Sequence, residues 1–92
     1  MIRSVKGSAT HQFVTGGRTR FRGLDEDLAR QRLAELNAAS SLDALSPLRS
    51  VHLHKLKGEW SGYWAMNVNG SWRIVFRFKD GHAYDVEIVD YH

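Results

Sequence analysis

VNGSWRIVFRF, residues 68–78, is the stretch that decides the fold of this chain. Its Asn69-Gly70 pair suits the positive backbone angles of a two-residue hairpin turn, so strands are predicted over Trp60 to Val68 and Ser71 to Phe78. In the second strand large apolar side chains alternate with smaller or charged ones, and successive side chains of a strand point to opposite faces. The apolar set is Trp72, Ile74, Phe76 and Phe78, and the other set is Ser71, Arg73, Val75 and Arg77. We therefore predict an antiparallel sheet with its aromatic face on helices and an open polar face that carries both arginines.

The first hairpin has a less regular register than its turn residues suggest. A two-residue Asn69-Gly70 turn would put three apolar residues of the preceding strand, Trp64, Met66 and Val68, on the arginine face. Either that face is partly covered, or the turn is not standard.

The second hairpin raises a similar problem of register. A two-residue loop at Asp80-Gly81 would pair Phe76 with Asp85 and set acids beside the apolar face. We predict instead a three-residue loop that also includes His82. This register sets Arg77 opposite Asp85. It also places Tyr84, Val86 and Ile88 beside Phe78, Phe76 and Ile74, respectively.

Helices are predicted before the sheet. Residues Asp25 to about Ala39 carry apolar side chains at helical spacing, and three opening acids favour the positive end of the helix dipole. The other elements predicted in this half are a short strand over Ile2 to Val5, a short helix over Ser8 to Thr15 closed by Gly16 and Gly17, and one turn over Leu42 to Leu45. Ser46-Pro47 should end that turn, because proline disfavours helical geometry in the residue before it. The sheet then begins with a strand over Val51 to Leu56, in which His52 and His54 share a face.

The composition sets limits on the kind of protein. A chain of 92 residues allows one domain, which we predict to span residues 1–92. The absence of cysteine rules out disulfides and thiolate metal ligands, and it fits a reducing cytosol. No stretch approaches the roughly 20 apolar residues of a membrane helix, and the first residues lack the apolar core of a signal peptide. The expected location is therefore cytoplasmic.

The positive charge is grouped along the sequence. The net charge is +3, and basic residues gather in three clusters that favour binding of a polyanion on one side of the protein. The clusters are Arg18, Arg20 and Arg22; Lys55 and Lys57; and Arg73, Arg77 and Lys79.

Five segments of the chain resemble the HigB toxins of the RelE superfamily in their order and spacing. They are Met1-Ile2-Arg3-Ser4, His54-Lys55-Leu56-Lys57-Gly58, Gly62-Tyr63-Trp64, Val68-Asn69-Gly70-Ser71-Trp72-Arg73-Ile74 and the terminal Val89-Asp90-Tyr91-His92. Three places depart from the pattern: Lys55, where relatives commonly carry proline; Asn67, where a basic residue is frequent; and the stretch from Lys6 to Arg22. The resemblance implies an α+β, RelE-like fold, with N-terminal helices packed on one face of a twisted antiparallel sheet.

The same resemblance implies ribosome-dependent, metal-independent cleavage of messenger RNA in the ribosomal A site, which inhibits translation. In such cleavage the 2'-hydroxyl attacks the adjacent phosphorus, so a base, an acid and stabilising cations are needed. By resemblance His54 and His92 are the acid–base candidates, with the base not assigned between them. Lys57 and Arg73 would stabilise phosphate charge, and Asp90 and Tyr91 would orient the other groups. The basic residues predicted to contact RNA are Arg18, Arg20, Arg22, Lys55, Arg77 and Lys79.

Partners also follow from the resemblance. They are a cognate helix-turn-helix antitoxin similar to HigA, the 70S ribosome with its message, and operator DNA bound only through the antitoxin complex. No membrane partner, metal or other cofactor is expected.

Each of these assignments has an ordinary alternative. A terminal histidine is usually frayed and solvated, and surface His, Lys and Arg residues are common. Four residues, His52, His54, Asp90 and His92, are also acceptable zinc ligands, although their spacing matches no established zinc pattern. Two other functions stay open. One is a ParE-like toxin that binds DNA gyrase without catalysis, and the other is a basic module that grips ribosomal RNA through its phosphates.

Overall fold

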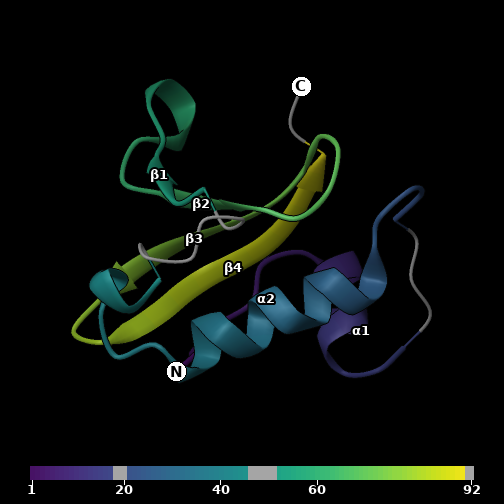
Figure 1. Cartoon of the computed structure of the whole chain (residues 1–92), viewed down its shortest axis with the longest axis horizontal. Helices are drawn as coiled ribbons and strands as arrows, with labels where there is room; N and C mark the ends of the chain where they lie inside the picture. Colours follow the sequence, from purple (N-terminus) through teal and green to yellow (C-terminus); the bar gives the residue numbers. More distant parts are fainter. Residues whose placement is uncertain (18–20, 46–51, 91–92) are drawn as a thin grey trace.

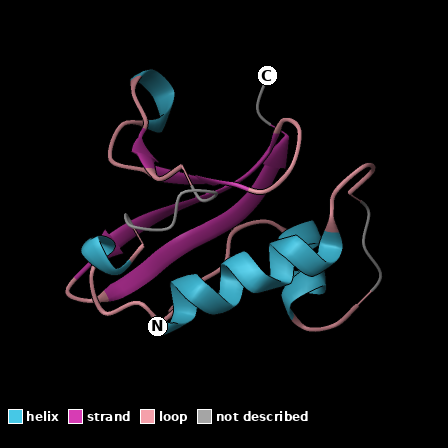
Figure 2. Ribbon diagram, in the orientation of Figure 1, coloured by secondary structure: helices cyan, strands magenta, loops and turns pink. Residues whose placement is uncertain are grey.

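Two α-helices lie against one face of a four-stranded antiparallel sheet in the computed structural model, which describes residues 1–17, 21–45 and 52–90 (Figure 1). The helices are α1 (Ser8–Val14) and α2 (Glu26–Ala38), followed by the short 3-10 helix η1 (Leu42–Ala44). The strands, in spatial as in chain order, are β1 (His54–Lys55), β2 (Trp64–Asn67), β3 (Trp72–Lys79) and β4 (His82–Asp90), with the 3-10 helix η3 (Gly58–Trp60) between β1 and β2 (Figure 2). The predicted α+β architecture is confirmed.

The main core lies between the helices and the sheet. Apolar side chains of both helices, including Phe13 and Leu36, meet Ile74, Phe76 and Val86, and all five are completely buried. The predicted inward face of β3 is therefore confirmed. None of the helices in the described ranges is long and apolar enough to cross a membrane.

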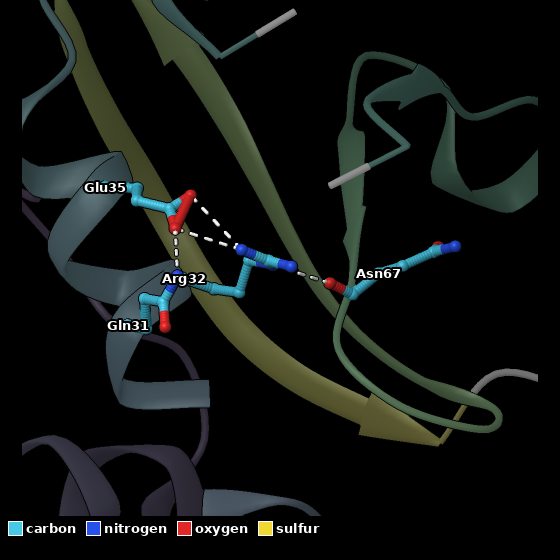
Figure 3. A network of polar contacts seen from close by, with 4 residues as sticks. All are labelled: Gln31, Arg32, Glu35 and Asn67. Carbon is cyan, nitrogen blue, oxygen red and sulfur yellow. Dashed lines mark hydrogen bonds and ion pairs between the residues drawn. The ribbon is translucent and has the colours of Figure 1, made fainter. Parts of the chain in front are cut away.

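Helix α2 forms where the sequence predicts it. The Asp25 carboxylate accepts a hydrogen bond of 3.0 Å from the Leu28 N–H and caps the first turn, so the helix begins one residue after the predicted start. A buried arginine, Arg32, joins the helix to the sheet (Figure 3). Its Nη1 lies 3.0 Å from Glu35 Oε1, and its Nε donates to the Asn67 carbonyl at 3.2 Å. Helix α2 is thus fixed to the end of β2.

The N-terminal segment is less regular than predicted. Residues 2 and 5 form two isolated parallel bridges with Ala83 and Val86 of β4, instead of a strand over Ile2 to Val5. The following helix α1 ends one residue before the predicted Thr15, and Gly16 with a φ of 86° follows, as expected for a helix C-terminus. The turn predicted over Leu42 to Leu45 is confirmed as η1 with Leu45 as its cap.

The first hairpin has the non-standard turn. The Val68 N–H donates to the Trp72 carbonyl at 3.0 Å, so three residues, 69–71, form the loop, and the predicted two-residue turn is wrong. Trp64 pairs with Phe76 and Met66 pairs with Ile74, so β2 turns these apolar side chains toward the helices. The strand also starts at Trp64 instead of Trp60, because η3 and a turn occupy the residues before it.

The second hairpin has a two-residue loop and a bulge. Lys79 pairs with His82 across Asp80-Gly81, so the predicted three-residue loop is wrong, and Arg77 pairs with Tyr84 instead of Asp85. The register shifts between Val75 and Arg77, and Asp85 has a φ of +52°. This shift has the effect of one extra residue in β4 and restores the predicted pairing of Ile74 with Ile88.

The sheet face away from the helices is partly covered, contrary to the prediction of an open polar face. Leu56, Tyr63, Ala65 and Val75 form a second buried cluster there. The chain between β1 and β2 contributes Leu56 and Tyr63 to this cluster, and Trp60 packs against it, with the Trp60 and Tyr63 rings in edge contact at 5.2 Å. The segment from η3 to β2 is therefore held against this face, which we call the outer face.

Candidate active site

Cross-strand pairing places two of the predicted catalytic residues on the outer face. His54 pairs with Ala65, which pairs with Val75 of the second buried cluster. Arg73 pairs with Asn67 on one side and Val89 on the other. Residues directly opposite each other in an antiparallel sheet share a face, and so do residues two apart on one strand. His54 and Arg73 therefore lie on the same face, with β2 between their strands and a displacement of two residues along the strand. These spacings correspond to roughly 12 Å between their Cα atoms.

Arg73 is held by the loop of the first hairpin. Its Nη1 donates to the Gly70 carbonyl at 2.7 Å and to the Trp72 carbonyl at 2.9 Å. The side chain is half-buried, and a guanidinium carries five N–H donors in a fixed plane. With Nη1 bound to main chain, the donors on Nη2 and Nε are the ones that this arrangement can offer to an anion such as phosphate.

His54 has a defined ring orientation even though its side chain is exposed. Its Nδ1 lies 2.7 Å from the main-chain carbonyl oxygen of His52. His52 itself has a φ of +48°, a conformation that costs a non-glycine residue about 1–2 kcal/mol. The predicted strand from Val51 is therefore wrong in the part that the structure describes, because β1 begins at His54 and His52 lies outside it; Val51 is outside the described residues.

The two lysines of this segment lie differently. Lys57 is exposed and immediately precedes η3, whose Trp60 N–H donates to the Lys57 carbonyl. Lys55 pairs with Trp64, a residue packed toward the helices, so its side chain starts on the face opposite to that of His54. Of the two lysines, Lys57 directly precedes the segment that is held against the outer face.

The end of β4 supplies another predicted residue. Asp90 pairs with Trp72, and its Oδ1 accepts a hydrogen bond from the Ser71 hydroxyl. Because Trp72 directly precedes Arg73 in the chain, Asp90 lies at the same end of the sheet as Arg73. Tyr91 and His92, which complete the predicted catalytic set, lie outside the described residues.

The basic residues predicted to contact RNA are spread over the molecule. Arg77 lies over the Tyr63 ring at 4.8 Å, and its Nε lies 3.6 Å from Asp85 Oδ2. Its hydrogen bond with Tyr63 is the main cause that raises the pKa of Arg77, and Asp85 adds to this effect. Arg77 and Lys79 line a hollow of about 550 Å³ at the far end of β3 from Arg73, together with Gly62, Phe78, Asp80 and Tyr84.

The remaining members of this set belong to the loop before α2. Arg22 is exposed, and its main-chain carbonyl accepts a hydrogen bond of 3.0 Å from Trp72 Nε1, at the end of the sheet that carries Arg73. Arg18 and Arg20 lie outside the described residues.

Two groups that the sequence argument did not single out contact the predicted site. They are the His52 carbonyl and the Ser71 hydroxyl. Histidine is among the residues that enter the left-handed region more often than most, but no sequence pattern marks His52 for it. Ser71 was expected on the arginine face, because it alternates with Trp72 in the predicted strand from Ser71 to Phe78. Its true place, the last residue of a three-residue loop, lets it reach Asp90.

The rival zinc site gains no support from the described part of the chain. In residues 1–17, 21–45 and 52–90, no group of three or more histidines and carboxylates is placed to hold a metal ion. His92, one of the four candidate ligands, lies outside these ranges.

Comparison with known proteins agrees with the fold and with the motifs. The family of HigB-like toxins, described as the RelE-like toxin of type II toxin–antitoxin system HigB, matches residues 6–92. The endoribonuclease HigB of Proteus vulgaris is 39% identical over 69 residues, which cover 74% of this chain and 73% of the relative. A crystal structure of a point mutant of YafQ from E. coli shares the fold with a TM-score of 0.63 and 19% identity, over 95% of this chain and 87% of that one.

These findings confirm both the predicted family and the predicted RelE-like fold. Membership of a toxin–antitoxin family also implies an antitoxin as a partner. The chain therefore belongs to the HigB-like toxins, the RelE-like toxins of type II toxin–antitoxin systems, among which its Proteus vulgaris relative is an endoribonuclease.

Proposed function

We propose that this toxin is a ribosome-dependent endoribonuclease that cleaves messenger RNA in the ribosomal A site. The observation that carries the proposal is the joint placement of His54 and Arg73 on the outer face, where an exposed imidazole and a partly bound guanidinium share one surface. The name of the Proteus vulgaris relative supports endoribonuclease activity.

The proposed reaction needs no group from outside the protein and the RNA. The 2'-hydroxyl loses its proton to a base, and its oxygen forms a bond to the adjacent phosphorus. The bond from phosphorus to the 5'-oxygen breaks, and that oxygen takes a proton from an acid. The products are a 2',3'-cyclic phosphate and a 5'-hydroxyl, and a cation beside the phosphate stabilises the charge that develops in between.

The residues divide these tasks. Arg73 and Lys57 stabilise the phosphate charge, since Arg73 offers planar donors and Lys57 is an exposed cation beside η3. His54 and His92 exchange protons with the RNA. Asp90 and Tyr91 orient the terminal segment, and the hydrogen bond from Ser71 fixes the Asp90 end of it.

The exposure of this site supports the proposed dependence on the ribosome. His54 and Lys57 are both exposed, and exposed side chains hold a flexible RNA strand less precisely than a closed cleft does. Misplacement of reacting groups by about 1 Å can cost on the order of a hundredfold in rate. The ribosome would supply the positioning by holding the message, so the toxin acts where ribosomes are, in the cytosol.

The proposed antitoxin is a small helix-turn-helix protein encoded beside the toxin gene. Its complex with the toxin would bind operator DNA, while the toxin alone would not. Co-expression with the neighbouring small reading frame should restore growth, and continued toxicity in the presence of a soluble antitoxin would contradict the pairing.

Single-turnover cleavage tests the proposed activity. The full-length toxin should cut ribosome-bound message in the A site much faster than the same RNA free in solution. Arg73→Ala should lose about a hundredfold or more in rate, as is typical when a donor to a developing charge is removed. Arg3→Ala is the matched control, because Arg3 is an exposed arginine that contacts His82 away from Arg73. Equal cleavage rates on free and ribosome-bound RNA would contradict ribosome dependence. Binding to the ribosome-bound message without cleavage would contradict the proposed nuclease activity.

A further inference from the structure

We infer that the main-chain carbonyl of His52 fixes the tautomer of His54, so that His54 takes the 2'-hydroxyl proton through Nε2. His52 is then a positioning residue that acts through its main chain. The inference rests on the proposed function for the chemical step, and on the contact between the two residues for the tautomer.

The direction of the hydrogen bond between the two residues is set by its partners. A carbonyl oxygen can only accept, so at 2.7 Å the Nδ1 atom of His54 must be the donor and must carry a proton. A neutral imidazole carries one proton on its two nitrogens. With that proton on Nδ1, the lone pair is on Nε2, which makes Nε2 the atom that can receive a proton.

The backbone of His52 is what makes this contact possible. With its φ of +48°, His52 directs its carbonyl toward the imidazole ring of His54. In an ordinary extended strand, successive carbonyls would instead point sideways, toward the hydrogen-bonding positions of a neighbouring strand. The strand in fact starts only at His54. Leu53 packs against the main core between the two histidines and anchors the segment.

The arrangement assigns a role to each nitrogen of His54. A histidine side chain in water prefers the tautomer with its proton on Nε2. Without the His52 carbonyl, most neutral His54 rings would therefore present an Nε2–H to the 2'-hydroxyl and could not accept its proton. The His52 carbonyl reverses this preference. His54 is therefore the base, and the proton for the leaving 5'-oxygen must come from another group.

Two substitutions separate the backbone of His52 from its side chain. His52→Gly and His52→Val both remove the imidazole. Glycine adopts a φ of +48° without cost, whereas a β-branched valine is a steric outlier there. The glycine variant should cleave ribosome-bound message within about twofold of the unmodified toxin. The valine variant should lose at least about tenfold, a part of the 10² to 10⁴ that an acid–base group typically contributes.

Nuclear magnetic resonance of the ¹⁵N-labelled full-length toxin gives a readout that a purely structural role would not move. At pH 9, above the range in which imidazoles ordinarily titrate, the His54 ring should show a protonated Nδ1 and an unprotonated Nε2. Loss of that signal set in His54→Gln assigns it. The glycine variant should keep the pattern and the valine variant should shift it toward protonated Nε2.

The outcomes distinguish this inference from the proposed function. A protonated Nε2 in the unmodified toxin overturns the inference, even if valine at residue 52 prevents folding. Full cleavage by a folded valine variant overturns it as well. If the toxin shows the expected His54 tautomer but cleaves no RNA, the result supports the fixed tautomer and contradicts the proposed nuclease activity.

Discussion

The Ser71 hydroxyl donates a hydrogen bond to the Asp90 carboxylate and joins the loop of the first hairpin to the last residue of β4. The bond connects the loop that holds Arg73 with the residue that precedes Tyr91 and His92 in the chain.

Ser71→Ala should therefore reduce cleavage more than stability. Because Ser71 is only partly buried and Asp90 is exposed, loss of the bond should cost about 1 kcal/mol of unfolding free energy. Cleavage of ribosome-bound message should fall by about tenfold, since the terminal segment loses one of its anchors. Ser71→Thr keeps the hydroxyl and serves as the control. Equal activity of the alanine and threonine variants would show that the bond has no part in catalysis.

Removal of His92 should abolish toxicity and leave the fold intact. The chain would then end at Tyr91, and loss of a terminal residue should cost less than about 1 kcal/mol of stability. Loss of an acid–base group removes about 10² to 10⁴ in rate. Thermal unfolding and single-turnover cleavage of the shortened and full chains measure the two effects. A shortened toxin that melts normally and cleaves at full rate would eliminate His92 from the site.

Lys55 and Lys57, the two lysines on either side of Leu56, should differ in their effect on cleavage. Lys57→Gln should lower the cleavage rate by about a hundredfold, as expected for a cation that stabilises developing charge. Lys55→Gln removes the same charge from a residue of β1 whose side chain starts on the face opposite to His54. This substitution should change the cleavage rate by less than about threefold. Single-turnover rates at two salt concentrations would separate catalysis from general attraction to RNA. Similar losses for both variants would point to a purely electrostatic role.

The bulge in β4 should be sensitive to the backbone of Asp85 and tolerant of its charge. Asp85 has a φ of +52°, and its N–H donates to the Ser4 hydroxyl at 2.8 Å. Asp85→Val should destabilise the protein by about 1–3 kcal/mol, because a β-branched residue resists this conformation. Asp85→Asn tolerates it and loses only the exposed ion pair with Arg77, which is worth about 0–1 kcal/mol. Denaturant unfolding measures the stability of both variants. A larger loss of stability in the Asp85→Asn variant than in the Asp85→Val variant would contradict this prediction.

The buried Arg32 should contribute to stability through its partners. Arg32→Ala removes the donor to the Asn67 carbonyl and leaves Glu35 without its ion pair, so unfolding should become easier by about 2–4 kcal/mol. Glu35→Gln retains an acceptor for the Arg32 side chain and should cost less. Chemical denaturation of both variants checks the order. An Arg32→Ala variant as stable as the unmodified protein would show that the connection between α2 and β2 adds little.

Local sequence patterns were sufficient for the elements whose stability is local. Helix α2 follows from its apolar spacing and its acidic start, and the inward face of β3 follows from simple alternation. Most of the candidate site came from motif resemblance, and pairing then placed His54 and Arg73 on one face. The His52 carbonyl was not predictable, because a positive φ at histidine depends on the packing of its neighbours.

The sequence by itself determined the helices, the apolar face of β3 and the family of the protein, whereas tertiary packing decided both hairpin loops. Asn69-Gly70 favours a two-residue turn, but burying Trp64 and Met66 against the helices requires a three-residue one. Burial of each such side chain is worth about 1.5–3 kcal/mol, more than the local preference of a turn. At Asp80-Gly81 the short loop persists, and the bulge at Asp85 restores the burial of Val86 and Ile88 at a backbone cost of about 1–2 kcal/mol. Loop length is decided by the side chains that it brings into the core, and those contacts exist only in the folded protein.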